Sequence, residues 1–260
     1  YPQITNSMLL GRFLHPKVDT LPRFMRNLYY RKRPAYSVRI AILGGTGSIG
    51  EGLALRLAAD TSHTIVVGSR DESKAADSAD SYESRLTNHG IERTIEYADN
   101  TAATINADIV VLAIPPHYVS DIIKTLVEQE VLEGQVIITP AVGMQGDGAG
   151  LHYDPPSAES ITELVAKRAP DSTTVVGAFH NLAADRLADL DADLGVDTLV
   201  VADDEGVRQQ VIELVNELTG IRALSAGPLV NAAEVESVTP LVINIARYND
   251  EMHNVGVKFS

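Results

Sequence analysis

An apolar segment that runs directly into a glycine-rich turn is the feature that most constrains the fold of this chain. Residues 39–50 read Arg-Ile-Ala-Ile-Leu-Gly-Gly-Thr-Gly-Ser-Ile-Gly, which places Gly45, Gly47 and Gly50 at the spacing G-x-G-x-x-G. In a strand–turn–helix unit these glycines permit the tight turn, the close approach of a pyrophosphate and the packing of the helix against the strand. The segment therefore predicts dinucleotide binding at a helix N-terminus. A purely structural glycine turn is the alternative.

The end of the next apolar run indicates which dinucleotide is bound. Sites selective for NAD place Asp or Glu there, about 20 residues past the glycines, to bind the ribose 2′-hydroxyl. This chain has Ser69 and Arg70 instead, with Lys74 one helical turn later. Because a hydroxyl and two cationic groups suit a 2′-phosphate, we predict NADP. The alternative is that Arg70 and Lys74 begin a solvated helix beside Asp71 and Glu72.

From Val38 onward, strand-like apolar runs alternate with helical patterns. This alternation predicts an α/β fold, a doubly wound, mostly parallel Rossmann-type sheet with a smaller, largely helical C-terminal part. The expected strands are 39–43, 64–67, 109–113, 136–139, 174–178 and 198–201, and the expected helices are 52–59, 72–88, 101–106, 119–128, 161–168, 207–218 and 233–246. We expect residues 146–156 to form a loop over the site, and Pro240 to kink or break the last helix.

The expected domain organisation has three parts. Residues 1–37 form an extension outside the core, such as a translated upstream region, since they lack the apolar stretch and cleavage site of a secretory signal. Residues 38–182 form the nucleotide-binding domain, and residues 183–260 form a smaller C-terminal domain.

Charge and cysteine content narrow the classes of function. Seven of the 21 Lys and Arg residues but only one of the 35 Asp and Glu residues lie within positions 1–36, so the remainder carries a net charge of −20. That charge opposes binding to nucleic acid and to anionic membranes, and it resembles the composition of proteins from salt-adapted organisms, with an ordinary acidic cytoplasmic protein as the alternative. The absence of cysteine excludes disulfides and thiolate chemistry and suits a cytoplasmic location.

Neither a membrane segment nor a metal site is expected. The longest apolar runs, such as 109–116, are far shorter than the roughly 18 residues that span a bilayer. The acidic block 185–193 has four aspartates at irregular spacing, which is more typical of a solvated helix than of metal ligands.

Three segments together carry a family resemblance. They are residues 43–50, residues 66–70 and the tail 235–241 with Asn244, and the ending Val-Gly-Val-Lys-Phe at 255–259 agrees with them. The chain resembles the NADPH:coenzyme F420 oxidoreductases of archaea and actinobacteria over nearly all of residues 38–260. The resemblance implies reversible hydride transfer between C4 of the nicotinamide of NADP(H) and C5 of the deazaflavin F420, with the two rings stacked in a cleft between the domains. Small-molecule cofactors are then the only expected partners besides a second copy of the chain, for which the apolar run 235–245 is a candidate contact.

The resemblance also implies cofactor-binding residues, since aligned rings need neither a nucleophile nor a metal from the protein. Besides the motif glycines Gly45 and Gly50, the implied contacts are Thr46, Gly47, Ser48 and Ile49 for the pyrophosphate, Ser69, Arg70 and Lys74 for the 2′-phosphate, Ile114, Pro115 and Val142 beside the nicotinamide, His180, Leu182 and Ala184 near the ring stack, and Gly227, Pro228 and Leu229 near the deazaflavin. Pro116 and Ala183 depart from the family pattern, which puts the contour of the deazaflavin pocket in question.

His180 has two interpretations, and the function has two rivals. The imidazole could donate a hydrogen bond to the deazaflavin carbonyl, or it could simply cap the end of a strand. An NADPH-dependent reductase of a small imine or ketone would need a Tyr or Lys proton donor in the cleft, for which the sequence offers no obvious candidate. A non-catalytic NADP sensor would bind NADPH without turnover.

Overall fold

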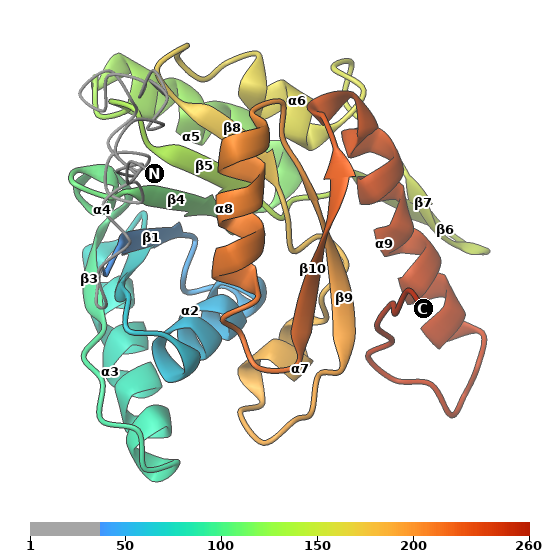
Figure 1. The fold of residues 1–260 in the computed structure, drawn as a ribbon, viewed down its shortest axis with the longest axis horizontal. Coiled ribbons are helices and arrows are strands. Elements are labelled where there is room, and N and C mark those ends of the chain that lie inside the picture. Colours follow the sequence, from blue (N-terminus) through green and yellow to red (C-terminus); the bar gives the residue numbers. More distant parts are fainter. Residues whose placement is uncertain (1–36) are drawn as a thin grey trace, which may run out of the picture.

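The computed structural model describes residues 37–260, so the expectations for residues 1–36 lie outside it (Figure 1). Within the described range the strands are β1 (Arg39–Leu43), β2 (Thr64–Ser69), β3 (Glu96–Asp99), β4 (Ile109–Leu112), β5 (Val136–Thr139), β6 (Met144–Asp147), β7 (Gly150–Tyr153), β8 (Thr174–Gly177), β9 (Val196–Val201) and β10 (Ile221–Gly227). The helices are α2 (Ser48–Asp60), α3 (Glu72–Asn88), α4 (Asn100–Thr104), α5 (Pro116–Glu128), α6 (Ile161–Ala166), α7 (Ala184–Ala188), α8 (Glu205–Val215), the 3₁₀ turn η2 (Leu229–Asn231) and α9 (Ala232–Arg247).

A central sheet organises the described residues. Its eight strands follow the order β10-β9-β8-β5-β4-β1-β2-β3, and all neighbours pair in parallel except β8 and β9. The chain leaves β1 toward β2 and β3 on one side and then crosses to β4 and β5 on the other. The strand order therefore reverses between β1 and β4, where open α/β sheets bind their ligands. The fold prediction is confirmed, and the C-terminal part adds two strands to its helices.

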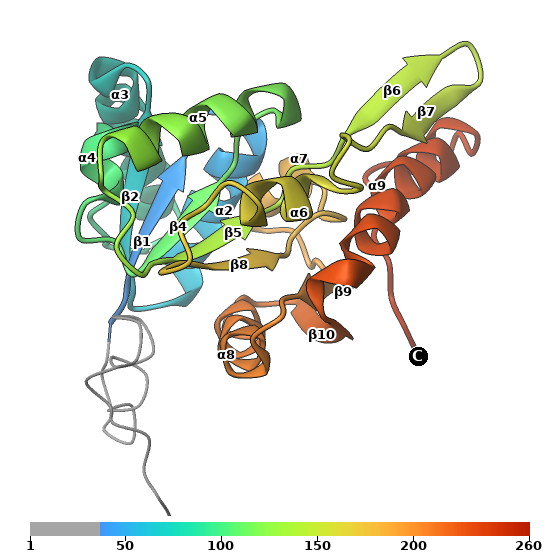
Figure 2. The same ribbon diagram turned by 90° about the horizontal axis from the view of Figure 1, so that it is seen from above.

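Helices cover both faces of the sheet. Side chains from α2, α3 and α8 form one apolar core with β1 and β4, and side chains from α4, α5 and α6 form a second core on the opposite face. Figure 2 shows α5 and α6 on one side of the sheet and α8 on the other. Strands β1, β4 and β5 are buried on both faces, which explains why they appear in the sequence as uninterrupted apolar runs.

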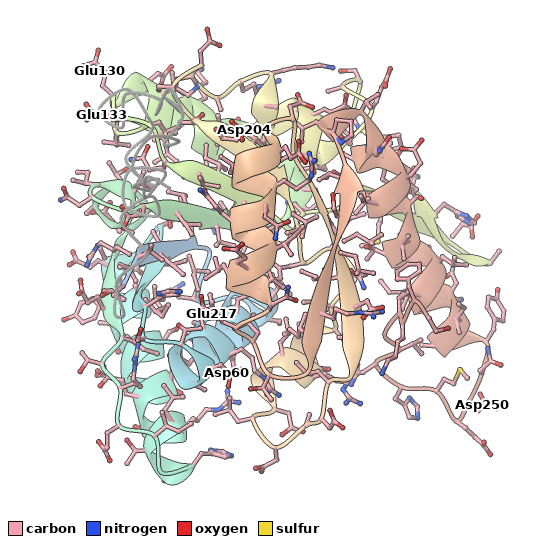
Figure 3. All side chains as sticks on the ribbon, viewed as in Figure 1. Asp60, Glu130, Glu133, Asp204, Glu217 and Asp250 are labelled. Atoms are coloured by element: carbon pink, nitrogen blue, oxygen red, sulfur yellow. The ribbon has the colours of Figure 1, made fainter. Side chains whose placement is uncertain are left out.

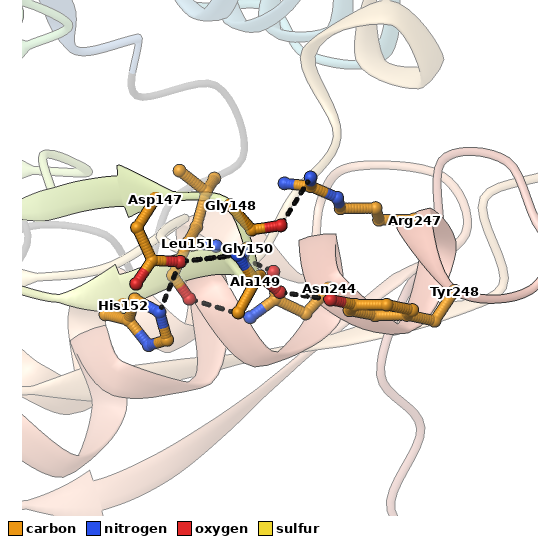
Figure 4. Close-up of polar contacts among 9 residues, drawn as sticks. All are labelled: Asp147, Gly148, Ala149, Gly150, Leu151, His152, Asn244, Arg247 and Tyr248. Carbon is orange, nitrogen blue, oxygen red and sulfur yellow. Dashed lines mark hydrogen bonds and ion pairs between the residues drawn. The ribbon is translucent and has the colours of Figure 1, made fainter.

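The segment expected to be a loop over the site is a β-hairpin, so that prediction is wrong. Strands β6 and β7 pair antiparallel around a turn in which Asp147 accepts hydrogen bonds from the backbone N–H groups of Ala149 (2.7 Å) and Gly150 (3.1 Å). The amide of Asn244 on α9 then bonds both backbone groups of Leu151, at 2.8 and 2.7 Å (Figure 4). The hairpin is held along α9 and lines neither of the two larger cavities described below.

Helix α9 continues through Pro240, so of the two predicted effects, a kink or a break, the break does not occur. Proline removes one helical hydrogen bond, but tertiary contacts hold the helix on both sides of it. Glu236, one turn before, is fully buried and bonded to α6, and Asn244, one turn after, is bonded to the hairpin. Residues 229–247 are also the one helical stretch in the described range that is long and apolar enough to cross a membrane by length and composition alone, which is weak evidence for a span.

The acidic block 185–193 is helical only in its first part, where α7 ends at Ala188. The buried guanidinium of Arg56, on α2, holds the segment by donating to the backbone carbonyl groups of Leu187 (3.0 Å), Arg186 (3.3 Å) and Ala192 (3.2 Å). In residues 37–260 no group of three His, Cys, Asp or Glu side chains is arranged to hold a metal ion. Backbone carbonyls bound to one arginine thus account for the conformation of this segment.

Candidate functional site

The glycine turn connects β1 to α2, and each motif glycine faces different surroundings. A Cβ on Gly50 would lie 2.4 Å from the carbonyl oxygen of Gly44, and a Cβ on Gly45 would lie 2.8 Å from that of Ile42, so both positions require glycine for backbone packing. A Cβ on Gly47 would meet nothing closer than 3.4 Å. Gly47 is also the N-cap of α2 and offers no side-chain acceptor to the first-turn amides. These N–H groups are therefore suited to an anion.

Hydrogen bonds to both backbone groups of Gly45 hold the glycine turn in place. The backbone N–H of Gly45 donates to the carbonyl oxygens of Ile42 (3.1 Å) and Gly68 (3.0 Å). The hydroxyl of Tyr82, on α3, donates to the carbonyl oxygen of Gly45 at 2.8 Å, and burial raises the pKa of this tyrosine to about 12. Tyr82 therefore stays a neutral donor that supports the turn. Nothing in the local sequence pattern distinguishes it from any other apolar position of an amphipathic helix.

The predicted 2′-phosphate residues lie at the end of β2. Ser69 is buried, whereas Arg70 and Lys74 are exposed. The neighbouring carboxylate of Asp71 caps α3 and accepts from the backbone N–H (3.1 Å) and the hydroxyl (2.7 Å) of Ser73, and this hydrogen bonding lowers the pKa of Asp71. The hydrogen bonds of Asp71 are therefore made within its own helix, and no ion pair joins it to Arg70 or Lys74 in the described residues.

A cleft of about 660 Å³ joins these two regions, within the range of cofactor pockets. Of the residues predicted from the sequence, it is lined by Thr46, Gly47, Ser69, Arg70, Lys74, Ile114 and Pro115. Five other predicted residues do not line the cleft. Four of them form or support the glycine turn, namely Gly45, Ser48, Ile49 and Gly50, and the fifth, Val142, is buried after β5. The sequence did not predict seven further residues, which the fold brings to the cleft from the end of β3, from α4 and from α5: Asp99, Asn100, Thr101, Tyr118, Asp121, Ile122 and Thr125.

A second cavity, of about 310 Å³, lies at the end of β8. His180, Leu182 and Ala184 line it as a group, and the facing wall includes Thr239 and Val242 of α9. The remaining predicted residues line neither cavity: Gly227 ends β10, Pro228 follows it, and Leu229 begins η2. Because β5 stands between β4 and β8 in the sheet, the two cavities lie at the ends of nearby parallel strands.

His180 is buried, with 4% of its surface exposed, and its environment decides its charge. Burial lowers the pKa of His180 to about 3, so the imidazole is neutral near pH 7 and has one donor and one acceptor nitrogen. Its Nε2 lies 3.5 Å from the hydroxyl of Thr162, and its Nδ1 has no hydrogen-bond partner among the described residues. The carbonyl oxygen of His180 accepts from the hydroxyl of Thr239 at 2.9 Å.

A buried carboxylate ties the elements around this cavity together. Glu236, on α9, accepts from the backbone N–H groups of Ile161 (3.0 Å) and Thr162 (2.9 Å) at the start of α6. It also accepts from the hydroxyls of Thr162 (2.8 Å) and of Tyr153 (3.1 Å), on β7. Burial raises the pKa of Glu236, although four donors face the carboxylate. The residue occurs within the C-terminal segment of the resemblance, but its capping role was not predicted.

The family model and the curated relatives point to one family, and the solved structures support the fold. Residues 39–143 match the family model described as NADP oxidoreductase, coenzyme F420-dependent. The F420-dependent NADP reductase of Methanocaldococcus jannaschii is 37% identical over 211 residues, covering 80% of this chain and 92% of the relative. That of Methanothermobacter marburgensis is 30% identical over 226 residues, covering 86% and 98%. A crystal structure from Arthrobacter sp. FB24, assigned as an F420-dependent NADP-reductase, superimposes with a TM-score of 0.69 at 22% identity, covering 86% of this chain and all of that one.

Proposed function

Because the chain belongs to the family of F420-dependent NADP reductases, we propose that it transfers hydride reversibly between NADP(H) and coenzyme F420. When bound, the nicotinamide and the deazaflavin supply the hydride donor and acceptor themselves. The protein then has to bind the two molecules, align their rings and exclude water. The observation that carries the proposal is the 660 Å³ cleft, which joins the glycine turn to Arg70 and Lys74 at the C-terminal edge of a parallel sheet.

The nucleotide end of the cleft offers backbone N–H groups and cationic side chains that suit the phosphates of NADP(H). The open side of Gly47 and the uncapped first turn of α2 would receive the pyrophosphate, with Thr46, Ser48 and Ile49 beside it. Arg70 would bind the 2′-phosphate in the plane of its guanidinium group, with Lys74 as a second cation and Ser69 as a hydroxyl donor. No carboxylate ends β2 to select a free 2′-hydroxyl.

The reacting rings would lie between the two cavities. Ile114 and Pro115 end the cleft on the β4 side and Val142 follows β5, so these residues would border the nicotinamide. The cavity at His180, Leu182 and Ala184 would receive the deazaflavin ring, and residues 227–229, which do not line this cavity, would contact only the part of the cofactor outside it. In this arrangement residues 38–182 form the NADP-binding domain and residues 183–260 complete the F420 site.

The exposed apolar side chains of α9 and of Tyr248, which follows it, support a homodimer. Leu241 is 58% exposed, Tyr248 64%, and Ile243 and Ile245 about 40%. A second copy of the chain would cover this surface, and small-molecule cofactors would be the other partners. An exposed patch of this kind on a soluble chain indicates a protein contact.

The charge of the described residues supports a cytoplasmic location in a salt-adapted archaeal cell. Acidic side chains such as Glu130, Glu133 and Asp250 project from the periphery (Figure 3), and Arg outnumbers Lys by ten to four in residues 37–260. The net charge of −20 also opposes the approach of an anionic cofactor. Added salt should therefore speed the reaction by screening this repulsion.

The testing experiment mixes the purified protein with NADPH and oxidised F420 and follows loss of the visible absorbance of the deazaflavin. NADH serves as the control, and salt is varied from low to molar concentration. Rapid bleaching with NADPH and slow bleaching with NADH would support both the reaction and the coenzyme. Binding of NADPH without bleaching at any salt concentration would refute the proposal and favour a sensor or a reductase of another substrate.

A further inference from the structure

Arg70 lies in a cleft that is also lined by the carboxylates of Asp71, Asp99 and Asp121, yet it forms no ion pair within residues 37–260. Two of the three carboxylates are engaged elsewhere. Asp71 caps α3, and Asp99 caps α4 by accepting from the backbone N–H groups of Thr101 and Ala102, both at 2.9 Å. The guanidinium group therefore keeps its donors available.

The contact that Arg70 does make is with an aromatic ring. The guanidinium carbon lies 5.5 Å from the centroid of Tyr118, in the first turn of α5, which is within the range of a cation–π interaction. The ring of His117 packs against Tyr118 with the centroids 4.1 Å apart. Arg70 follows β2 and Tyr118 follows β4, on opposite sides of β1. The pair therefore connects the two walls of the cleft across the glycine turn.

An aromatic partner has a different consequence from a carboxylate partner. A carboxylate would occupy two guanidinium donors and would present a negative charge to an incoming phosphate. A ring contacts only the face of the guanidinium group and leaves its in-plane N–H donors available. It also restricts the rotamers of a long side chain before the ligand arrives, which lowers the entropy cost of binding.

We propose that Tyr118 is a positioning residue that holds Arg70 across the cleft for the 2′-phosphate of NADP(H), and that it thereby contributes to the preference for NADP(H) over NAD(H). This inference rests on the proposed function, because it assigns the same cleft to NADP(H). The strength of a cation–π contact at an exposed site corresponds to about a two- to fivefold change in affinity. Tyr118 is 45% exposed, so the effect belongs in that range.

The test compares dissociation constants for NADPH and NADH, measured by fluorescence titration without F420, in three variants of the full chain. Tyr118→Leu removes the ring, and Tyr118→Phe keeps it while removing the hydroxyl. Tyr97→Leu is the matched control, because Tyr97 is 48% exposed on β3 and does not line the cleft. The NADPH-to-NADH affinity ratio should fall about two- to fivefold in Tyr118→Leu and stay unchanged in the other two.

A double-mutant cycle that combines Tyr118→Leu with Arg70→Ala shows whether Tyr118 acts through Arg70. In the Arg70→Ala background, Tyr118→Leu should no longer change the ratio. If Tyr118→Leu alone leaves the NADPH-to-NADH affinity ratio unchanged, the inference is overturned. This holds if the variant binds both coenzymes more weakly by the same factor, as expected for simple stacking on the adenine, and also if it binds both as tightly as the wild type. Thermal unfolding of each variant verifies that the fold is intact. Because the readout is coenzyme binding, failure of this inference is distinguishable from failure to reduce F420.

Discussion

Glu236→Gln should destabilise the protein, because it replaces a buried carboxylate that joins α9, α6 and β7 by a group with half as many acceptor sites. One carboxylate oxygen accepts from the N–H and the hydroxyl of Thr162, and the other accepts from the N–H of Ile161 and the hydroxyl of Tyr153. A glutamine amide presents one oxygen and one NH₂ group. In either orientation, two of the four donors face the NH₂ group.

The magnitude follows from which donors can adapt. A hydroxyl can rotate to accept from the NH₂ group, but the backbone N–H of Ile161 or Thr162 cannot, so one buried donor is left unsatisfied at a cost of about 1–3 kcal/mol. Loss of charge assistance in the remaining bonds adds about 1 kcal/mol. Removing a buried charge returns part of its desolvation cost, which is the reason that the pKa of Glu236 is raised. We expect a net loss of about 2 kcal/mol, or about 4–8 °C in Tm.

Urea unfolding at neutral pH, monitored by circular dichroism, measures this difference. Glu234→Gln is the matched control, because Glu234 is exposed on the same helix and its substitution should change the free energy of unfolding by less than about 0.5 kcal/mol. If Glu236→Gln is as stable as the control, or more stable than the wild type, the desolvation cost exceeds the value of the four hydrogen bonds, and the reasoning fails.

Three further predictions concern the cleft and the C-terminus. Arg70→Ala should weaken NADPH binding by about 10- to 100-fold and NADH binding by less than twofold, and equal losses in titrations of both coenzymes would contradict the assignment. Gly50→Ala should lower stability by about 2–3 kcal/mol, because the added Cβ would lie 2.4 Å from the carbonyl oxygen of Gly44. Gly47→Ala, by contrast, should fold normally and bind both coenzymes more weakly. Thermal unfolding measures the difference, and a Gly50→Ala variant as stable as the wild type would contradict the prediction. The hydrogen bond from Arg222 lowers the pKa of Asp197, so the stability from this carboxylate is present above the unfolded value of 3.8 and is lost as pH falls through the lower folded value. The difference in unfolding free energy between wild type and Asp197→Asn should therefore be constant from pH 7 to about pH 5 and shrink as pH falls below 3.8, and a difference that stays constant down to the acid limit of folding would refute the linkage.

The parts of the fold that were predictable are those with local signals. Strands β1, β4 and β5 are buried on both faces and appear as apolar runs, and the glycine turn is a contiguous motif. Strand β3 was missed because it is a short, polar edge strand with the sequence Glu-Tyr-Ala-Asp. Strand β10, another edge strand, was also missed, and five of its seven residues are exposed or only partly buried.

Other features depend on contacts between distant parts of the chain. The hairpin β6–β7 is held by Asn244, 93 residues away from Leu151, so its own sequence reads as a glycine-rich loop. At the site, Arg70 and Lys74 follow one strand and were predicted together. Tyr118 reaches the same cleft only because β4 lies beside β1, which no local pattern reveals. Glu236 caps a helix 75 residues earlier in the chain for the same reason.

The reversal of strand direction between β8 and β9 in the described sheet has a mechanical consequence. Strands β5 and β8 share four registered residue pairs, and β9 and β10 share six, but β8 and β9 meet only at Gly177 and Val201. Separating β8 from β9 therefore disrupts one registered residue pair, whereas separating β5 from β8 or β9 from β10 disrupts several pairs and their hydrogen bonds. We expect local opening of the sheet to require least free energy at this seam, because few hydrogen bonds hold it. The seam borders His180, so the most weakly paired line in the sheet runs beside the cavity that we propose for the deazaflavin.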